Sequence, residues 1–182
     1  MAWEAQFLLW IQLHLRNPVT DPLVSLFTHL GDHGLLFIAL TLLLLLYPKT
    51  RRVGLAVGLG LLCSLLFTNL LLKPIFQRAR PWVAYSFLTP LVSEPDPNSF
   101  PSGHTSAAFA FALAFLRSDT KRWAKAAVAV LAVFMGLSRL YVGVHYPTDV
   151  LAGFLVGDLA GLAGWYLSHT ISVKFSQNRP PS

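Results

Sequence analysis

Residues 53–72 read VGLAVGLGLLCSLLFTNLLL, and this run of 20 residues contains no charged side chain. A helix rises about 1.5 Å per residue, so a helix of this length covers the ~30 Å hydrocarbon core of a bilayer. The run therefore predicts a membrane-spanning helix.

The composition of the whole chain favours an integral membrane protein. Of its 182 residues, 54% are hydrophobic and only 12% are charged, which disfavours both a disordered chain and an ordinary soluble domain. The formal net charge of +6 is scattered between apolar runs, so we expect no nucleic-acid partner. No polar linker interrupts the chain, so a single domain over residues 1–182 is predicted. The lone Cys63 excludes an intrachain disulfide.

Further apolar runs predict four more spans, which cover residues 23–47, 104–116, 124–139 and 150–167. In the first of them, His29, Asp32 and His33 interrupt the apolar pattern and place that part near a membrane interface. Residues 3–15 are apolar but too short for a comfortable span, so an interfacial helix is predicted there, with a sixth span as the alternative. The expected fold is an all-α, polytopic transmembrane helix bundle.

The basic residues of the connections predict the orientation of the bundle. Nine fall on one side of the predicted membrane, namely Lys49, Arg51, Arg52, Arg117, Lys121, Arg122, Lys125, Lys174 and Arg179. Five fall on the other side, namely Arg16, Lys73, Arg78, Arg80 and Arg139. Because cytoplasmic loops are enriched in Lys and Arg, the tail is expected in the cytoplasm. The chain shows no basic stretch and small-residue cleavage site typical of a signal peptide.

Three polar segments with unusual residue combinations are predicted to lie together on the non-cytoplasmic side. The first contains Lys73, six further residues, and then Arg80 followed by proline. The second is Pro-Ser-Gly-His at 101–104. The third is Ser-Arg at 138–139, followed after five residues by His145 and after three more by Asp149.

In this order and spacing, the three segments resemble the tripartite motif of the type 2 phosphatidic acid phosphatase superfamily. Its members include lipid phosphate phosphatases, isoprenoid diphosphate phosphatases and vanadium haloperoxidases. The resemblance extends upstream to Thr-His-Leu-Gly at 28–31 and covers most of the chain, with every motif residue present. It implies a membrane phosphatase, which we expect in a bacterial cell membrane. The count of basic residues predicts that its active site lies on the non-cytoplasmic side.

The residues of these segments suit an anion. Pro101 is suited to the first turn of a helix, so the N–H groups of Ser102, Gly103 and His104 are expected to be free donors. Gly103 lets the backbone approach an oxyanion closely. The cations that we expect to bind phosphate are Lys73, Arg80 and Arg139, which are costly at the ends of spans without an anion.

The histidines can divide covalent catalysis between them. His145 precedes Asp149 by four residues, and Pro147 starts a helix between them. The carboxylate is therefore expected to hold one ring nitrogen and to leave the other free to attack phosphorus. The resemblance implies a phosphohistidine intermediate, with His104 protonating the leaving oxygen and later activating water. This scheme requires no metal and no cofactor.

Other polar and small residues are expected to have structural roles. His29 and His33 have the spacing of metal ligands, but Gly31 weakens a helix there, and a polar rim beside the site is favoured over metal binding. Asp158 is expected to hydrogen-bond to Asn69 or Ser64. A smooth helix-packing face is predicted for Gly153, Gly157 and Gly161, with Gly164 out of register. Either a lipid entrance or an interfacial belt can explain Trp82, Tyr85 and Phe87.

The predicted partners are membrane lipids and a lipid phosphate or diphosphate substrate. Residues 104–116 form only ~20 Å of helix, which places His104 in a recessed pocket suited to a lipid head group. Undecaprenyl diphosphate is the favoured substrate, with phosphatidylglycerophosphate and phosphatidate as alternatives. The alternative outside the enzymes is a lipid transporter or scaffold that binds head groups without cleaving them. A third interpretation, a soluble vanadate-dependent oxidant, is disfavoured by the high hydropathy of the chain. Nothing in the sequence indicates the oligomeric state.

Overall fold

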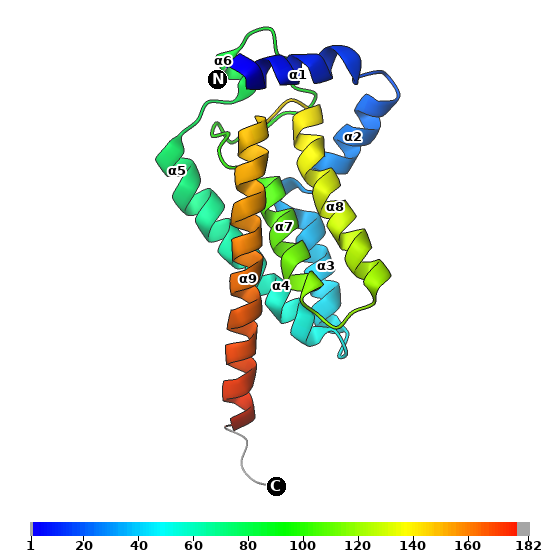
Figure 1. The fold of residues 1–182 in the computed structure, drawn as a ribbon, viewed down its shortest axis with the longest axis vertical. Helices are drawn as coiled ribbons and strands as arrows, with labels where there is room; N and C mark the ends of the chain where they lie inside the picture. The colour runs from blue at the N-terminus through cyan, green and yellow to red at the C-terminus, as the bar shows by residue number, and fades with distance from the viewer. Residues whose placement is uncertain (1, 178–182) are drawn as a thin grey trace.

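The computed structural model describes residues 2–177, with side chains described as far as Ile171, and the described chain folds as an all-helical bundle (Figure 1). The helices in chain order are α1 (Ala2–His14), α2 (Thr20–His29), the 3-10 turn η1 (Asp32–Gly34), α3 (Leu35–Leu46), α4 (Arg51–Leu65), the π-helical stretch η2 (Leu66–Leu72), α5 (Lys73–Phe76), α6 (Pro81–Ala84), α7 (Gly103–Leu116), α8 (Arg122–Tyr141) and α9 (Pro147–Gln177). The predicted fold class is confirmed.

Several of the predicted spans have the length and composition to cross a membrane. Residues 51–76 form one continuous helical run through α4, η2 and α5, and α8 and the first 25 residues of α9 also qualify. The predicted span 23–47 is instead a pair of helices bent by 47°. The remaining predicted span corresponds to α7, which has 14 residues and is therefore only about 21 Å long. The number of membrane crossings stays a prediction.

The bend in the 23–47 span lies between α2 and α3. His33 and Gly34 have positive φ values of 52° and 73°, in the left-handed region that glycine adopts without cost. These residues end one helix and redirect the next. The break brings the polar residues Asp32 and His33 to the wall of a cavity between the helices.

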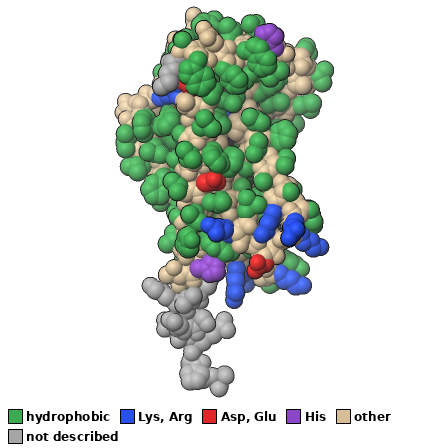
Figure 2. Space-filling view, in the orientation of Figure 1, with side chains coloured by type: hydrophobic (Ala, Val, Ile, Leu, Met, Phe, Trp, Pro, Cys, Tyr) green, Lys and Arg blue, Asp and Glu red, His purple; other side chains and the backbone are tan. Residues whose placement is uncertain are grey.

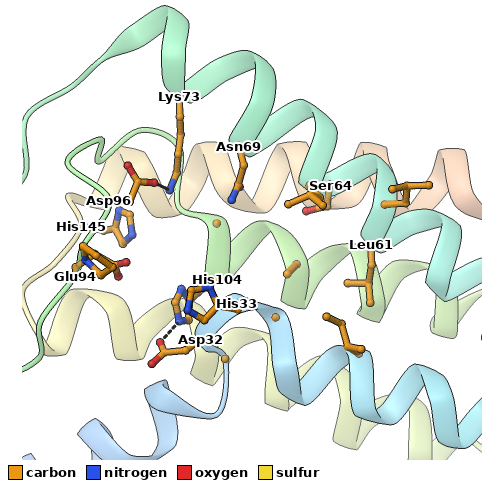
Figure 3. Close-up of a pocket in the computed structure, with 18 of the residues that line it drawn as sticks. Asp32, His33, Leu61, Ser64, Asn69, Lys73, Glu94, Asp96, His104 and His145 are labelled. Atoms are coloured by element: carbon orange, nitrogen blue, oxygen red, sulfur yellow. Dashed lines mark hydrogen bonds and ion pairs between the residues drawn. The ribbon is translucent and has the colours of Figure 1, made fainter.

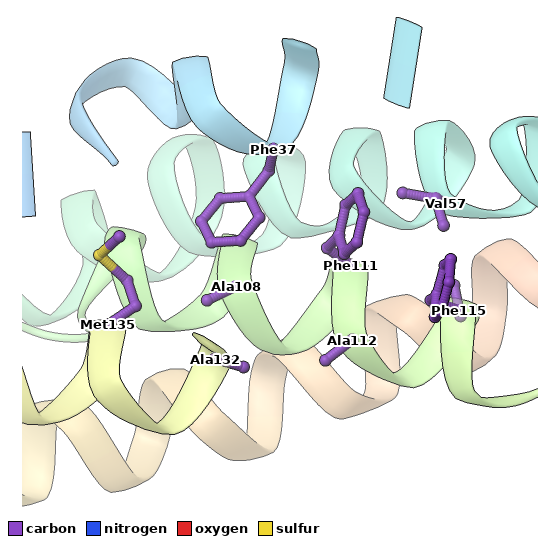
Figure 4. Close-up of a cluster of buried hydrophobic side chains, with 9 residues drawn as sticks. Phe37, Val57, Ala108, Phe111, Ala112, Phe115, Ala132 and Met135 are labelled. Atoms are coloured by element: carbon purple, nitrogen blue, oxygen red, sulfur yellow. The ribbon is translucent and has the colours of Figure 1, made fainter. Parts of the chain in front are cut away.

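The hydrophobic core surrounds α7, which packs against α9, α8 and α4. Its members, shown in Figure 4, are Phe37, Val57, Ala108, Phe111, Ala112, Ala114, Phe115, Ala132 and Met135. The predicted glycine face of α9 is confirmed, because a Cβ added at 153, 157 or 161 would come within 2.7, 2.5 and 2.6 Å of carbonyl oxygens of α7 or its N-cap. Gly164 faces α4 instead. The close approach of α7 and α9 aligns the two helix ends that carry the second and third motif segments.

Helix α1 lies across the end of the bundle instead of running along it (Figure 1). Its inner face buries Glu4, Ala5, Leu8 and Ile11, at the spacing of one helix face. Its outer face exposes Trp3, Phe7, Trp10 and Leu13. A helix of 13 residues in this position fits the interfacial interpretation better than a sixth span.

Basic side chains gather at the opposite end of the bundle, near the loops that follow α3 and α7 (Figure 2). The predicted cytoplasmic residues from 49 to 52 and from 117 to 125 belong to these loops and to the first turns after them. Of the predicted basic residues in the tail, Arg179 lies outside the described residues, and the side chain of Lys174 is not described. The grouping at one end agrees with the expected charge asymmetry.

Candidate active site

A cavity of about 630 Å³ opens between α3, α4, η2, α7 and the loop that follows α6 (Figure 3). Five of the predicted site residues line it, namely Lys73, Arg80, Gly103, His104 and His145. The other three lie close behind its wall: Arg139 and Asp149 contact residues that line it, and Ser102 is buried at the start of α7. The fold therefore brings together segments that are up to 76 residues apart in the chain, from 73 to 149.

Carboxylates from the loop after α6 neutralise the predicted phosphate-binding cations. Lys73 Nζ donates to Asp96, and Arg139 Nη2 donates to Glu94. Arg80 Nη2 lies 3.8 Å from Glu94 Oε1. Burial raises the pKa of Asp96, but the hydrogen bond from Lys73 and other donors hold that pKa below its ordinary value. The sequence analysis missed both carboxylates, although two acids between two cationic motif segments are a usable signal.

The two arginines are almost completely buried, each with 1% of its surface exposed. Arg80 donates to the carbonyl oxygens of Asp96 and Val144, each at 3.0 Å. Arg139 donates to Thr28 Oγ1 at 2.7 Å. Arg80 Nη2 and Arg139 Nε have no hydrogen-bond partner among the described residues. Buried donors of this kind normally have acceptors, which the oxygens of a phosphate would supply.

His145 has a defined tautomer. Its Nε2 lies 3.1 Å from Arg80 Nη1, and a guanidinium can only donate, so Nε2 accepts and Nδ1 carries the proton. Nδ1 lies 3.6 Å from Asp149 Oδ2, within ion-pair range but too far for a hydrogen bond. Asp149 therefore faces the ring nitrogen that was expected, at ion-pair distance and without a hydrogen bond. Burial and the charges of Arg80 and Arg139 lower the pKa of His145 well below its ordinary value, so the ring is neutral.

Asp149 is fully buried and has three other donors. Its carboxylate accepts from Arg78 Nη1 at 2.6 Å, from the backbone N–H of Tyr146 at 2.8 Å, and from Ser99 Oγ. These donors already satisfy both carboxylate oxygens, which explains why the contact with His145 stays long. From the sequence, Arg78 counts only among the basic residues of the predicted non-cytoplasmic side, and its place two residues before Arg80 is the signal that points to it.

The start of α7 differs from the expectation in two respects. The helix begins at Gly103, and Ser102 is the N-cap, whose Oγ accepts from the N–H of Thr105. Pro101 therefore precedes the helix and is not in its first turn. The N–H of Ser102 donates to the carbonyl oxygen of Asp149 at 3.0 Å, so it is not a free donor. Gly103 keeps its predicted place, since a Cβ there would lie 3.9 Å from Lys73 Nζ.

The polar residues at the α2–α3 break belong to the site. His104 Nε2 donates to Asp32 Oδ1 at 2.9 Å, and Asp32 Oδ2 accepts from His29 Nδ1 at 2.7 Å. Asp32 and His33 line the cavity, so the predicted polar rim is confirmed. The direct contact between Asp32 and His104 was not foreseen. Within the described residues, no three His, Cys, Asp or Glu side chains form a cluster that could hold a metal ion.

Two further expectations concern Asp158 and the aromatic residues of 82–87, which do not line the cavity. Ser64 Oγ bonds to Ser106 Oγ at 2.7 Å, and Asp158 has no hydrogen bond to Ser64, to Asn69 or to any other described residue, so the predicted bond is wrong. The aromatic residues of 82–87 do not line the cavity. The indole of Trp82 packs beside a valine cluster, and Tyr85 and Phe87 contact each other, so this cavity gives no support to the entrance interpretation.

The described residues form a helical bundle in which a lysine, two histidines and two buried arginines lie in or directly behind the wall of one cavity. A family model described as PAP2 superfamily matches residues 52–172. The chain belongs to the PAP2 superfamily.

Relatives within this superfamily share both sequence and fold. An undecaprenyl-diphosphatase of Sulfolobus acidocaldarius is 30% identical over 141 residues, which cover 76% of this chain and 66% of that protein, slightly under two thirds of its length. The crystal structure of Aquifex aeolicus LpxE matches with a TM-score of 0.76 and 28% identity, over 87% of this chain and 92% of that chain. The crystal structure of the first transmembrane PAP2 type phosphatidylglycerolphosphate phosphatase from Bacillus subtilis matches with a TM-score of 0.73 and 29% identity, over 98% of this chain and 88% of that chain.

Proposed function

We propose that this chain is a membrane phosphatase that hydrolyses a lipid phosphate or diphosphate, with undecaprenyl diphosphate as the favoured substrate. The shape of the cavity carries this proposal. Its polar end contains the cations and the two histidines, and it continues between α3 and α4 along the apolar side chains of Ile38, Leu42, Leu61, Leu62 and Leu65 (Figure 3). A phosphate bound at the polar end would leave an attached lipid tail among these apolar side chains.

The first chemical step is the attack of His145 on phosphorus. The lone pair of Nε2, which accepts from Arg80 in the substrate-free geometry, forms the N–P bond. The bond from phosphorus to the lipid or phosphate oxygen breaks, and that oxygen keeps the electron pair and takes a proton from His104. The ring of His145 becomes positively charged, and the nearby carboxylate of Asp149 stabilises that charge.

The second step returns the enzyme to its starting state. His104, now neutral, takes a proton from water, and the water oxygen attacks the phosphohistidine and releases inorganic phosphate. Because His104 Nε2 donates to Asp32, the proton exchanged with the reacting oxygens in this geometry is carried by Nδ1. In the first step the ring of His104 carries both protons, and the carboxylate of Asp32, 2.9 Å from Nε2, is the counter-charge beside it.

Charge stabilisation in this scheme comes from the chain itself. Lys73, Arg80 and Arg139 supply three positive charges, and the first-turn N–H groups of Gly103 and His104 add the positive end of α7. An incoming phosphate would replace Glu94 and Asp96 as the partner of these cations. No divalent ion is needed for this neutralisation, so we expect activity to survive a strong chelator.

The favoured substrate has a single tail and two phosphates. The apolar part of the cavity between α3 and α4 suits a single prenyl chain. The relative from Sulfolobus is named an undecaprenyl-diphosphatase. Phosphatidylglycerophosphate is the second candidate, because the Bacillus structure that aligns with 98% of this chain is titled as a phosphatase of that class of lipid. The charge asymmetry of the loops favours a site that faces away from the cytoplasm of a bacterial cell.

A substrate panel on the purified protein in detergent micelles tests this proposal. Phosphate release would be compared for undecaprenyl diphosphate, phosphatidylglycerophosphate and phosphatidate, with and without a chelator, in the wild type and in His145→Ala. We expect chelator-resistant release that is fastest with the diphosphate, is absent in the variant, and is inhibited by vanadate, which resembles the transition state. Faster phosphate release from a monophosphate lipid would show that undecaprenyl diphosphate is not the preferred substrate. Lipid binding without any phosphate release would favour a lipid carrier or scaffold.

A further inference from the structure

Glu4 is the one acidic residue of α1, and it is completely buried, with 0% of its surface exposed. The neighbouring turns of this helix expose Trp3, Phe7 and Trp10. A carboxylate without partners would be strongly disfavoured in such a position. The partners of Glu4 therefore indicate why the chain keeps a charge there.

Both oxygens of Glu4 contact the segments that carry the active site. Oε2 accepts from Arg78 Nη2 at 2.7 Å. Oε1 accepts from the backbone N–H of Thr148 at 3.1 Å and from its Oγ1 at 2.6 Å. Thr148 is the second residue of α9, where N–H groups have no acceptor within the helix. Glu4 thus caps the helix whose third residue is Asp149, with a charge that suits the positive end of the helix.

Arg78 connects the same carboxylate to Asp149. Its Nη1 donates to Asp149 Oδ1 at 2.6 Å and to Thr148 Oγ1 at 2.7 Å. Its guanidinium lies over the ring of Tyr146, 3.9 Å from the ring centre. Burial lowers the pKa of Arg78, but the two carboxylates raise it above its ordinary value, so the arginine is charged. One guanidinium therefore bridges a carboxylate of α1 and the carboxylate nearest to His145.

We propose that Glu4 is a positioning residue for phosphoryl transfer, acting through Arg78 and Thr148 on Asp149 and, through Asp149, on His145. The inference rests on the proposed function. With Glu4 present, Glu4, Arg78 and Asp149 together carry one net negative charge, and without it they carry none. That negative charge stabilises the ring of His145 as it becomes positive, with Nδ1 only 3.6 Å from Asp149 Oδ2. The interfacial helix is then part of the catalytic apparatus as well as a membrane contact.

The test is Glu4→Gln, measured in the full-length protein in detergent with the best substrate of the panel. We expect kcat to fall on the order of tenfold, the effect of losing one hydrogen bond between charged groups. KM and the inhibition constant of inorganic phosphate should change less than about twofold, because the cations that bind phosphate are untouched. The acid limb of the kcat profile should move to lower pH, since removing a negative charge disfavours protonation of His145.

Matched variants separate positioning from structure. Gln6→Lys makes the same change in net charge on an exposed position of α1, and we expect it to behave as the wild type. Glu4→Asp keeps the charge on a side chain one methylene shorter and should recover part of kcat. Arg78→Lys should also lower kcat, and the loss in the double variant with Glu4→Gln should be smaller than the two single losses multiplied together, because both changes disturb the contact between Arg78 and Glu4.

Each outcome can be assigned. If the wild type releases phosphate and Glu4→Gln keeps its kcat, the positioning role is wrong. A parallel loss of kcat, phosphate binding and thermal stability in Glu4→Gln would indicate a purely structural role and would also overturn the proposal. If the wild type itself releases no phosphate from any lipid of the panel, it is the proposed function that fails, and the positioning role fails with it.

Discussion

Glu94 occupies the place where a phosphate oxygen is expected to bind, and this gives a quantitative prediction for Glu94→Gln. Its carboxylate accepts from Arg139 Nη2 and lies 3.8 Å from Arg80 Nη2, with only 16% of the side chain exposed. A substrate or inhibitor must displace this carboxylate before it can use the same donors. The variant keeps the shape of the side chain but removes its charge.

The magnitude follows from the exchange of one hydrogen bond for another. The hydrogen bond from an arginine to the carboxylate of Glu94 is taken to contribute about 1.5–3 kcal/mol, the range for bonds to charged groups. The bond to the neutral amide oxygen of the variant is taken to contribute about 0.5–1.5 kcal/mol. The anion therefore displaces a partner that is weaker by about 1–2 kcal/mol. Since 1.4 kcal/mol corresponds to about tenfold, vanadate and phosphate should inhibit Glu94→Gln roughly 5- to 30-fold more strongly than the wild type.

Inhibition constants for vanadate and phosphate, measured at fixed ionic strength, check this prediction. Asp119→Asn is the matched control, because it removes one carboxylate from an exposed loop at the opposite end of the bundle. Without anion, Glu94→Gln should melt at a lower temperature than the wild type, because two buried arginines lose a counter-charge. Vanadate should raise the melting temperature of the variant and so reduce this difference. Unchanged or weaker inhibition by vanadate in a folded Glu94→Gln protein would refute the reasoning.

Three further predictions concern acidity, packing and topology. Burial and nearby cations lower the pKa of His145 well below 6.5. We therefore expect kcat/KM, corrected for substrate ionisation, to stay constant as the pH falls to about 6. An acid limb with a pKa at or above the ordinary pKa of histidine would contradict this. Gly157→Ala places a Cβ 2.5 Å from a carbonyl oxygen of α7 and should destabilise by about 1–3 kcal/mol in thermal unfolding; Gly58→Ala, with 3.4 Å of clearance, should be neutral or stabilising. In a variant without the native cysteine, a cysteine at Ser93 should react with an impermeant thiol reagent in intact cells and one at Asp119 only after permeabilisation, whereas the reverse pattern would place the site in the cytoplasm.

The helices and the gathering of the motif residues could be predicted from the sequence for a simple physical reason. Uninterrupted apolar runs such as 53–72 have few alternatives to spanning helices, and the ends of such helices bring polar segments to one of two membrane faces. Lys73, His104 and His145 each stand at such an end. Their convergence on one cavity follows from the alternation of the spans.

What could not be predicted depends on contacts between distant segments. The conformation of the loop after α6 decides that Glu94 and Asp96 meet the cations, and no periodicity of the sequence encodes it. Glu4 looks like a polar residue on a short apolar helix until α1 is seen to lie across the start of α9. The donors that occupy Asp149, and hence its distance from His145, are likewise set by tertiary structure.

The trapped phosphoenzyme is the most direct measurement of the central claim. The purified protein would be mixed with substrate labelled at the transferred phosphate, quenched within one turnover, and digested to locate the label. The mechanism predicts a label on His145 that is stable to alkali and labile to acid, and no label in His145→Ala. An acid-stable label, or a label on any other residue, would contradict it.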